Sequence, residues 1–293
     1  MKAIVQPDAG LNPVVAAIRR ARTSIDICIF RLDRKEIEVA LTASVTRGVK
    51  VRALIANTNT GGDANLRKLE QRLLAGGVMV TRTSDELVRY HGKYMIADGT
   101  LYVFGFNFTK LDIAKSRSFA IATRDTRAVN EASKLFEADT TRQLYNPGRS
   151  NLVVSPETAR DSLAKFISGA RKDLAIYDVK VQDPLMIKVL KERARRGVRI
   201  RIIGSLKGSI EGVRVGKPPM RLHVRAVIRD GTRAFVGSQS LRKIELDDRR
   251  EVGLLISNPT VTRQLLAIFE SDWPGPRAIG SEEVKAAGSP GAR

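Results

Sequence analysis

Two stretches of the sequence share one eight-residue frame: residues 91–98 read HGKYMIAD, and residues 223–230 read HVRAVIRD. These stretches contain the only two histidines of the 293 residues, and each histidine stands at the first position of its frame. A matched pair that uses every histidine in the chain indicates an internal repeat, which decides the fold before any single motif is considered.

The sequence around each frame repeats in the same order. A helical stretch precedes an apolar strand with an acidic start, and a charged helix ending in glycine then leads into a basic strand. A later strand and a helix that closes on Phe-Glu-x-Asp follow each frame. The matching segments are 14–22 and 162–171, 26–30 and 173–177, 39–55 and 186–203, 117–123 and 250–256, and 136–139 and 269–272.

Strands that alternate with helices predict an α/β fold with a mixed, largely parallel sheet flanked by helices. Because the unit is duplicated, we expect two such halves, related by a pseudo-twofold axis and packed into one bilobal unit. The Pro/Gly/Asn-rich connection over 145–156 separates them, so the predicted halves are 1–145 and 146–273. Residues 274–293 have little to bury and are predicted to be a disordered tail.

The end of each frame predicts a β-hairpin, because Asp98-Gly99 and Asp230-Gly231 stand between two apolar strands. Within a strand, residues two positions apart share a face. His91 should therefore project beside Lys93, and each half should place an imidazole next to a cation.

Composition predicts the environment of the protein and the charge of its partners. With 51 basic and 31 acidic residues, the net charge is +20, which favours nucleic acid or an anionic lipid surface as a partner. The single cysteine, Cys28, excludes an intramolecular disulfide and suits a reducing compartment. No apolar stretch is long enough for a membrane span, and the N-terminus does not read as a signal peptide. We expect a cytoplasmic protein, with peripheral contact to an anionic membrane as one option.

The paired frames resemble the phospholipase D superfamily, whose signature is His-x-Lys-x4-Asp followed by Gly-Ser-x-Asn. Residues from Gly237 onward resemble bacterial phospholipase D-like and cardiolipin synthase-like proteins, and FNFTK at 106–110 resembles small nuclease members. The resemblance implies that both histidines meet in one cleft between the halves, so that a monomer suffices. It also implies a metal-independent, cofactor-free phosphodiesterase in which His91 forms a phosphohistidine and His223 is the general acid and base.

The resemblance assigns roles to eight further residues. Asp98 and Asp230 complete the catalytic motif, although a turn position before glycine explains both without chemistry. Glu251 matches a carboxylate that hydrogen-bonds a catalytic imidazole and fixes its tautomer. Lys93 and Arg225 are the cations expected to bind the phosphoryl oxygens. Asn107, Ser238 and Ser240 are the expected polar ligands of the substrate. Two histidines and one cysteine leave no recognisable zinc or two-metal site.

The chain departs from the family pattern at several positions. Arg225 replaces the second lysine, Ser240 stands where the second asparagine is expected, and Ser118 occupies the place equivalent to Glu251. The first Gly-Ser-x-Asn element is one residue short and lacks its serine. Three hypotheses therefore remain: an enzyme acting on a phospholipid, which is slightly preferred, a metal-independent nuclease, and a catalytically degenerate protein that binds polyanions.

Overall fold

The protein is described by a computed structural model that covers residues 1–58 and 62–274. The prediction of a disordered tail concerns residues that lie, Pro274 apart, outside this part of the chain. The elements of the first half are β1 (Lys2–Gln6), α1 (Asn12–Arg20), β2 (Ser24–Ile29), α2 (Lys35–Thr46), β3 (Lys50–Ile55), α3 (Asp63–Ala75), β4 (Met79–Arg82), β5 (Arg89–Tyr90), β6 (Tyr94–Ala97), β7 (Thr100–Phe104), α4 (Lys110–Ala114), β8 (Ser116–Thr123) and α5 (Thr126–Thr141).

The second half repeats this order, except that the described residues between its third and fourth strands form no helix like α3. Its elements are β9 (Leu152–Ser155), α6 (Ala159–Ser168), β10 (Asp173–Val181), α7 (Pro184–Arg195), β11 (Arg199–Leu206), β12 (Val213–Gly216), β13 (Arg221–Leu222), β14 (Arg225–Arg229), β15 (Arg233–Gly237), α8 (Lys243–Asp247), β16 (Arg249–Ile256) and α9 (Pro259–Asp272).

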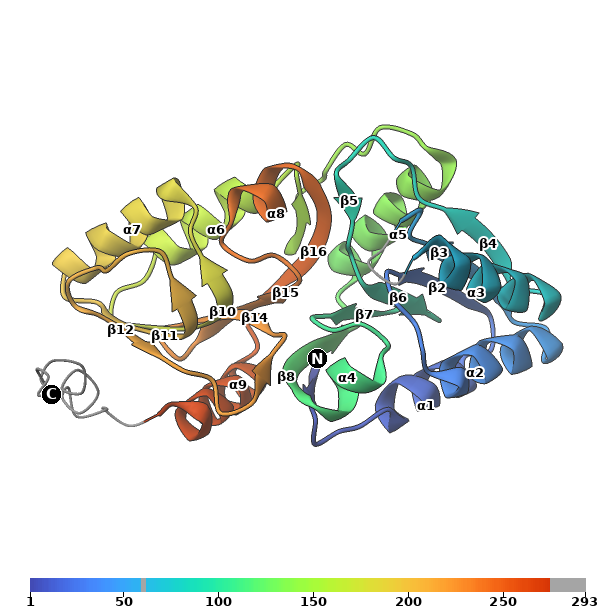
Figure 1. The fold of residues 1–293 in the computed structure, drawn as a ribbon, viewed down its shortest axis with the longest axis horizontal. Helices are drawn as coiled ribbons and strands as arrows, with labels where there is room; N and C mark the ends of the chain where they lie inside the picture. The colour runs from blue at the N-terminus through green and yellow to red at the C-terminus, as the bar shows by residue number, and fades with distance from the viewer. Residues whose placement is uncertain (59–61, 275–293) are drawn as a thin grey trace, which may run out of the picture.

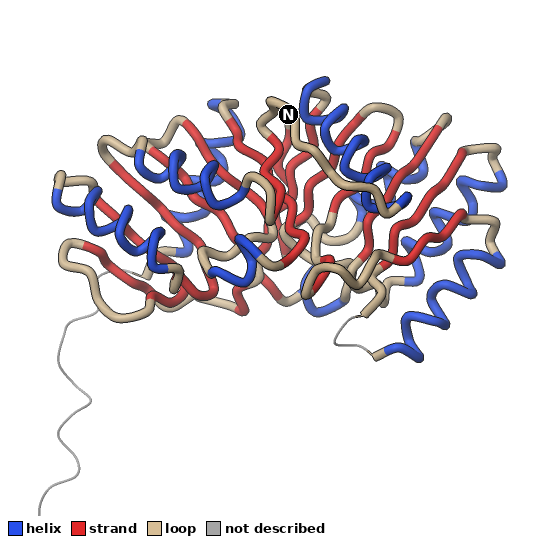
Figure 2. The backbone as a smooth tube through the Cα atoms, turned by 90° about the horizontal axis from the view of Figure 1, so that it is seen from above, coloured by secondary structure: helices blue, strands red, loops and turns tan. Residues whose placement is uncertain are grey.

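Each half builds one sheet, and the strand order is the same in both. The order β1-β8-β7-β6-β2-β3-β4 in the first half corresponds strand by strand to β9-β16-β15-β14-β10-β11-β12 in the second. Figure 1 shows the two lobes side by side, and Figure 2 shows their strands from above with helices packed around them. The predicted bilobal α/β fold is confirmed. Among the strands of one half, parallel pairing is confined to β2, β3 and β4 and to their counterparts, because the hairpins make the rest antiparallel.

A short strand from each half crosses to the sheet of the other half. β5, just before His91, pairs in parallel with β16, and β13, just before His223, pairs in parallel with β8. The backbone N–H of His91 donates to the carbonyl of Arg250 at 2.7 Å, and that of His223 donates to the carbonyl of Arg117 at 3.1 Å. Both histidines are therefore held at the junction of the two lobes by the opposite half.

The strands β1 and β9 were not predicted from the sequence. Each lies antiparallel on the last strand of its own sheet, β1 on β8 and β9 on β16. Pro7 and Pro156 follow them directly, and the Pro/Gly-rich surroundings of both segments read as irregular connections. Proline is tolerated there because it stands beyond the last paired residue of the strand.

The two predicted hairpins are present, and an aspartate fixes each one to the rest of its sheet. Asp98 and Gly99 both have positive φ, +44° and +72°, as a two-residue type I′ turn requires. The Asp98 carboxylate accepts hydrogen bonds from the backbone N–H groups of residues 22–24 at 2.7–3.0 Å. Asp230 does the same for residues 171–173 at 2.7–3.2 Å. Each hairpin is thereby joined to the start of the central strand of its sheet.

The interface between the halves is a single buried core crossed by two equivalent ion pairs. Phe119 of β8 packs edge-to-face on Tyr177 of β10, with ring centroids 5.5 Å apart. Arg117 of the first half binds Asp272 of the second at 2.6 Å, and Arg250 of the second binds Asp139 of the first at 3.1 Å. The repeated Phe-Glu-x-Asp ending of α5 and α9 thus supplies the partner of a buried arginine across the interface.

Candidate active site

The histidines lie between strands rather than within one. Residues 91–93 separate β5 from β6, and residues 223–224 separate β13 from β14, so the predicted continuous strands are broken there. The predicted neighbours still meet. The Lys93 ammonium donates to the carbonyl of His91 at 2.6 Å, and the Arg225 guanidinium donates to the carbonyl of His223 at 3.0 Å.

His91 is paired with a carboxylate from the other half. Its Nδ1 lies 2.8 Å and 3.0 Å from the two oxygens of Glu251 on β16. Glu251 is fully buried, and this burial raises the pKa of its carboxyl, while Lys93 and Ser238 oppose the rise. Because Nδ1–H is donated to a carboxylate, the lone pair of the neutral ring lies on Nε2.

His223 has a different partner. Ser118 occupies the position equivalent to Glu251, and its hydroxyl is buried without a hydrogen-bond partner among the described residues. The carboxylate of Asp112, on α4, lies 3.4 Å from Nε2 of His223 instead. The two histidines therefore meet a carboxylate through opposite ring nitrogens, Nδ1 in His91 and Nε2 in His223.

Two cations from different halves act on both imidazoles. Burial first, and then the charges of Lys93 and Arg225, lower the pKa of His91 well below its ordinary value. Burial, Arg225 and Lys93 also lower the pKa of His223, while Asp112 opposes this. Burial lowers the pKa of Lys93 itself to about 8. One cation from each half thus acts on each ring, and both imidazole pKa values are lowered.

The three predicted polar ligands are all buried near these groups. Asn107 donates from its backbone N–H and its side-chain amide to Asp112, at 3.0 Å and 2.7 Å. Ser240 donates from its backbone N–H to Glu245 at 2.6 Å, and its hydroxyl accepts from Arg225 Nε at 3.2 Å. The Ser238 hydroxyl donates to the carbonyl of Val252 at 3.3 Å and accepts from its N–H at 3.1 Å, so both of these contacts are to the backbone of β16.

Two buried carboxylates, Asp112 and Glu245, were missed in the sequence. Each stands five residues after a polar ligand, in NFTKLD (107–112) and SLRKIE (240–245), and each accepts the backbone N–H of that ligand. Arg221, at the start of β13, binds Asp112 at 2.6 Å across the junction. Aligning Asn107 with Ser240 reveals the shared five-residue spacing. The first half is one residue shorter after Gly105, and this difference hides the match in the sequence.

Asp98 and Asp230 lie away from this cluster. Asp98 is exposed and is separated from Lys93 by the length of β6, a distance of roughly 16 Å for five strand residues. The carboxylates of both aspartates are occupied by the backbone N–H groups described above. Their positions therefore correspond to the hairpin role considered for them in the sequence.

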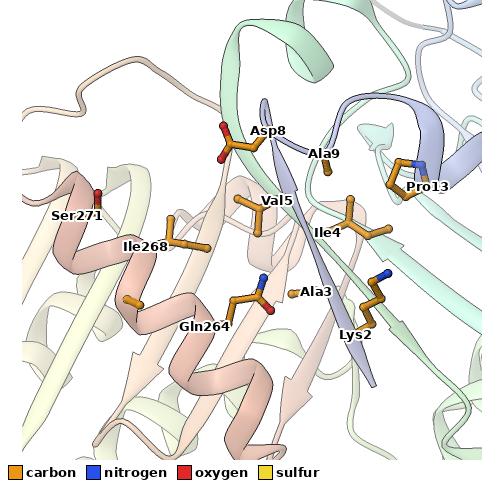
Figure 3. Close-up of a pocket in the computed structure, with 11 residues that line it drawn as sticks. Lys2, Ala3, Ile4, Val5, Asp8, Ala9, Pro13, Gln264, Ile268 and Ser271 are labelled. Atoms are coloured by element: carbon orange, nitrogen blue, oxygen red, sulfur yellow. The ribbon is translucent and has the colours of Figure 1, made fainter.

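A separate pocket lies where β1 of the first half meets α9 of the second. Figure 3 shows Val5, Ile268 and Ser271 among the side chains that line it, and its volume is about 610 Å³. None of the predicted site residues lines this pocket. Within residues 1–58 and 62–274, no three His, Cys, Asp or Glu side chains are grouped to hold a metal ion, and no helix has the length and apolarity of a membrane span.

Comparison with known proteins identifies the class of this fold. Residues 14–140 match the family described as "Cardiolipin synthase, PLD-like domain". No curated protein sequence matches the chain. The predicted resemblance to the phospholipase D superfamily is therefore confirmed over residues 14–140.

Solved structures share this architecture. Polyphosphate kinase from Porphyromonas gingivalis superposes with a TM-score of 0.76 at 20% identity, over 92% of this chain and 46% of that chain. Phosphatidylserine synthase from Haemophilus influenzae superposes with a TM-score of 0.68 at 13% identity, over 92% of this chain and 84% of that chain. This chain therefore spans less than half of the kinase and most of the synthase, and at these identities the likeness defines the fold alone.

Proposed function

We propose that the chain is a phospholipase D-like phosphodiesterase that works through a covalent phosphohistidine without metal or other cofactor. The observation that carries this proposal is that the crossing strands β5 and β13 bring His91 with Lys93, and His223 with Arg225, to the junction of the two halves. Displacement at phosphorus needs a nucleophile, a proton donor and positive charge around the non-bridging oxygens, and these four side chains supply all three. One chain provides both halves of the site, so a monomer is sufficient.

The reaction begins with His91. Its Nε2 lone pair attacks phosphorus, the bond from phosphorus to the leaving oxygen breaks, and His223 in its imidazolium form gives that oxygen a proton and becomes neutral. Water or an alcohol then attacks the phosphohistidine while His223 takes its proton, and the P–N bond pair returns to His91. Lys93 and Arg225 bind the non-bridging oxygens in both steps, and Glu251 holds Nδ1–H of His91 so that Nε2 faces phosphorus. In this proposal the two halves of the site belong to the domains 1–145 and 146–273.

A phosphatidyl group is the preferred substrate. The family description of residues 14–140 names cardiolipin synthase, which favours a phospholipid as the substrate. The net charge of +20 would draw the chain to the surface of an anionic membrane, where it would act as a peripheral protein on the cytoplasmic side. The same charge also favours the second candidate, a metal-independent nuclease, because a polyanion of any kind gains from it.

The test is a panel of phosphodiesters incubated with the full chain in EDTA, with His91→Ala as the control. Release of headgroup from phosphatidylglycerol vesicles, and its exchange for added ethanol, is the expected result. Cleavage of single- or double-stranded DNA instead would establish the nuclease. If neither vesicles, DNA nor bis(p-nitrophenyl) phosphate react, and His91→Ala leaves polyanion binding unchanged, the protein is a binder and the proposal is wrong.

A further inference from the structure

The two histidines face carboxylates through different ring nitrogens. This difference indicates which nitrogen of each ring carries the proton. Glu251 receives Nδ1 of His91, while Asp112 faces Nε2 of His223. A neutral imidazole has one N–H and one lone pair, and an ionised carboxylate attracts the first and repels the second. The protons of the two rings should therefore stand on opposite nitrogens.

The surroundings of Asp112 favour its ionised form, although only 2% of the residue is exposed to solvent. Burial raises the pKa of Asp112, but His223, Asn107 and Arg221 lower it below its ordinary value. One carboxylate oxygen accepts two hydrogen bonds from Asn107, and the other accepts one from Arg221 at 2.6 Å. These donors fix the carboxylate against Nε2 of His223, at 3.4 Å.

His223 has no competing acceptor at that nitrogen. Nε2 is buried and makes no hydrogen bond of good geometry to the described residues, so Asp112 is the acceptor that its N–H faces. The other charged groups that act on His223 are the cations Arg225, Lys93 and Arg221, which cannot accept a proton from it. In the second half, Glu245 occupies the position equivalent to Asp112, and its oxygens contact Ser240, Arg242 and Arg249 rather than a histidine.

We infer that Asp112 is a positioning residue that holds one proton of His223 on Nε2, so that Nδ1 is the nitrogen that gains and loses the transferred proton. The inference rests on the proposed function for its catalytic consequence, since Nδ1–H of the imidazolium is then the group that protonates the leaving oxygen. It explains how a site that lacks a second Glu251 still holds the ring of His223 in one orientation.

The direct test is a nitrogen-15 spectrum of the imidazole rings of the full chain. With only two histidines, the spectrum contains two ring systems, which His223→Ala assigns. The wild-type protein should show His91 protonated on Nδ1 and His223 protonated on Nε2. Asp112→Ala should abolish the preference in His223 alone, and Asp112→Asn should retain part of it because an amide oxygen still accepts. Glu245→Gln is the matched control and should leave the tautomer of His223 unchanged.

A wild-type His223 protonated on Nδ1 would overturn the inference, and so would a folded Asp112→Ala protein with an unchanged His223 spectrum. The wild-type spectrum judges the inference even if Asp112→Ala does not fold, or if no ester is hydrolysed and the proposed function fails. Kinetics add a second readout. Asp112→Ala should slow an ester of phenol at least about tenfold more than an ester of p-nitrophenol, which leaves with less need of an acid. Equal slowing of both esters would show a merely structural role.

Discussion

The two halves share one topology but surround their histidines with different side chains. The first half contributes His91 and Lys93, and the second contributes His223 and Arg225. Glu251, from the second half, binds His91. The hydroxyl of its counterpart Ser118 has no hydrogen-bond partner in the described part of the chain, and Asp112 lies beside His223 instead. The crossing strands β5 and β13 pair in equivalent ways in the two halves. The side chains around the two histidines, in contrast, differ between the halves. Two chemical roles in one reaction require this kind of difference.

The largest difference between the halves should appear at Glu251 and Ser118. Glu251→Gln should lower kcat about 10²- to 10⁴-fold, because His91 loses the carboxylate that fixes its tautomer. Ser118→Ala should change kcat little, since the Ser118 hydroxyl has no hydrogen-bond partner in the described part of the chain. Steady-state rates on bis(p-nitrophenyl) phosphate measure both, and equal effects of the two changes would show that the asymmetry is not functional.

Arg117 and Arg250 form equivalent ion pairs across the interface, so their replacement should destabilise the protein to a similar extent. Arg117→Met and Arg250→Met should each lower the free energy of unfolding by about 3–5 kcal/mol, because each leaves a buried aspartate without its partner. The loss should be greater for Arg250, which also binds Glu157. Urea denaturation of each variant tests this, and a loss under about 1 kcal/mol in both would contradict a shared, ion-paired interface.

The hairpin aspartates should also behave alike. Asp98→Ala and Asp230→Ala each remove a charged acceptor from three backbone N–H groups at the surface, and each should lower the free energy of unfolding by about 1–2 kcal/mol. At a temperature where both variants are folded, kcat/KM should be close to wild type. A large fall in kcat with unchanged stability would instead show that both aspartates take part in catalysis.

The two phosphate-binding cations should differ in their dependence on pH. Lys93 has a pKa of about 8, lowered by burial, so its positive charge is present below that pH and is lost above it. Arginine keeps its charge across this range. Above pH 8, kcat/KM of the wild type should fall by up to about tenfold per pH unit, and Lys93→Arg should remove that fall. A decline that persists unchanged in Lys93→Arg would have to come from another group.

Much of the fold could be predicted because the repeat supplied two independent readings of each segment. Gly48 and Gly197, with φ of +86° and +81°, end equivalent helices as the sequence suggested, and both Asp-Gly turns form hairpins. The edge strands β1 and β9 could not be found, because they are short and are stabilised by pairing with β8 and β16, far away in the sequence. These two segments form strands because they pair with distant strands, and the local composition does not indicate this pairing.

The candidate site was predicted where its residues match the family motif and was missed at Asp112, which that motif does not include. His91, Lys93 and Glu251 stand in recognisable patterns, and the structure brings them together. Asp112 carries no signal of its own, since a lone aspartate on a short helix resembles any surface residue. Its contact with His223 depends on how β13 crosses the interface, which no local pattern specifies.

The most direct test of the division of labour is to locate the phosphoryl group on the protein. Bis(p-nitrophenyl) phosphate is mixed with the wild type and with His223→Ala, the reaction is quenched in alkali within milliseconds to minutes, and peptide mass is measured. The phosphoryl adduct should be found on His91, and it should accumulate in His223→Ala because the base that activates water is gone. An adduct on His223, or none on either histidine while substrate turns over, would contradict the account.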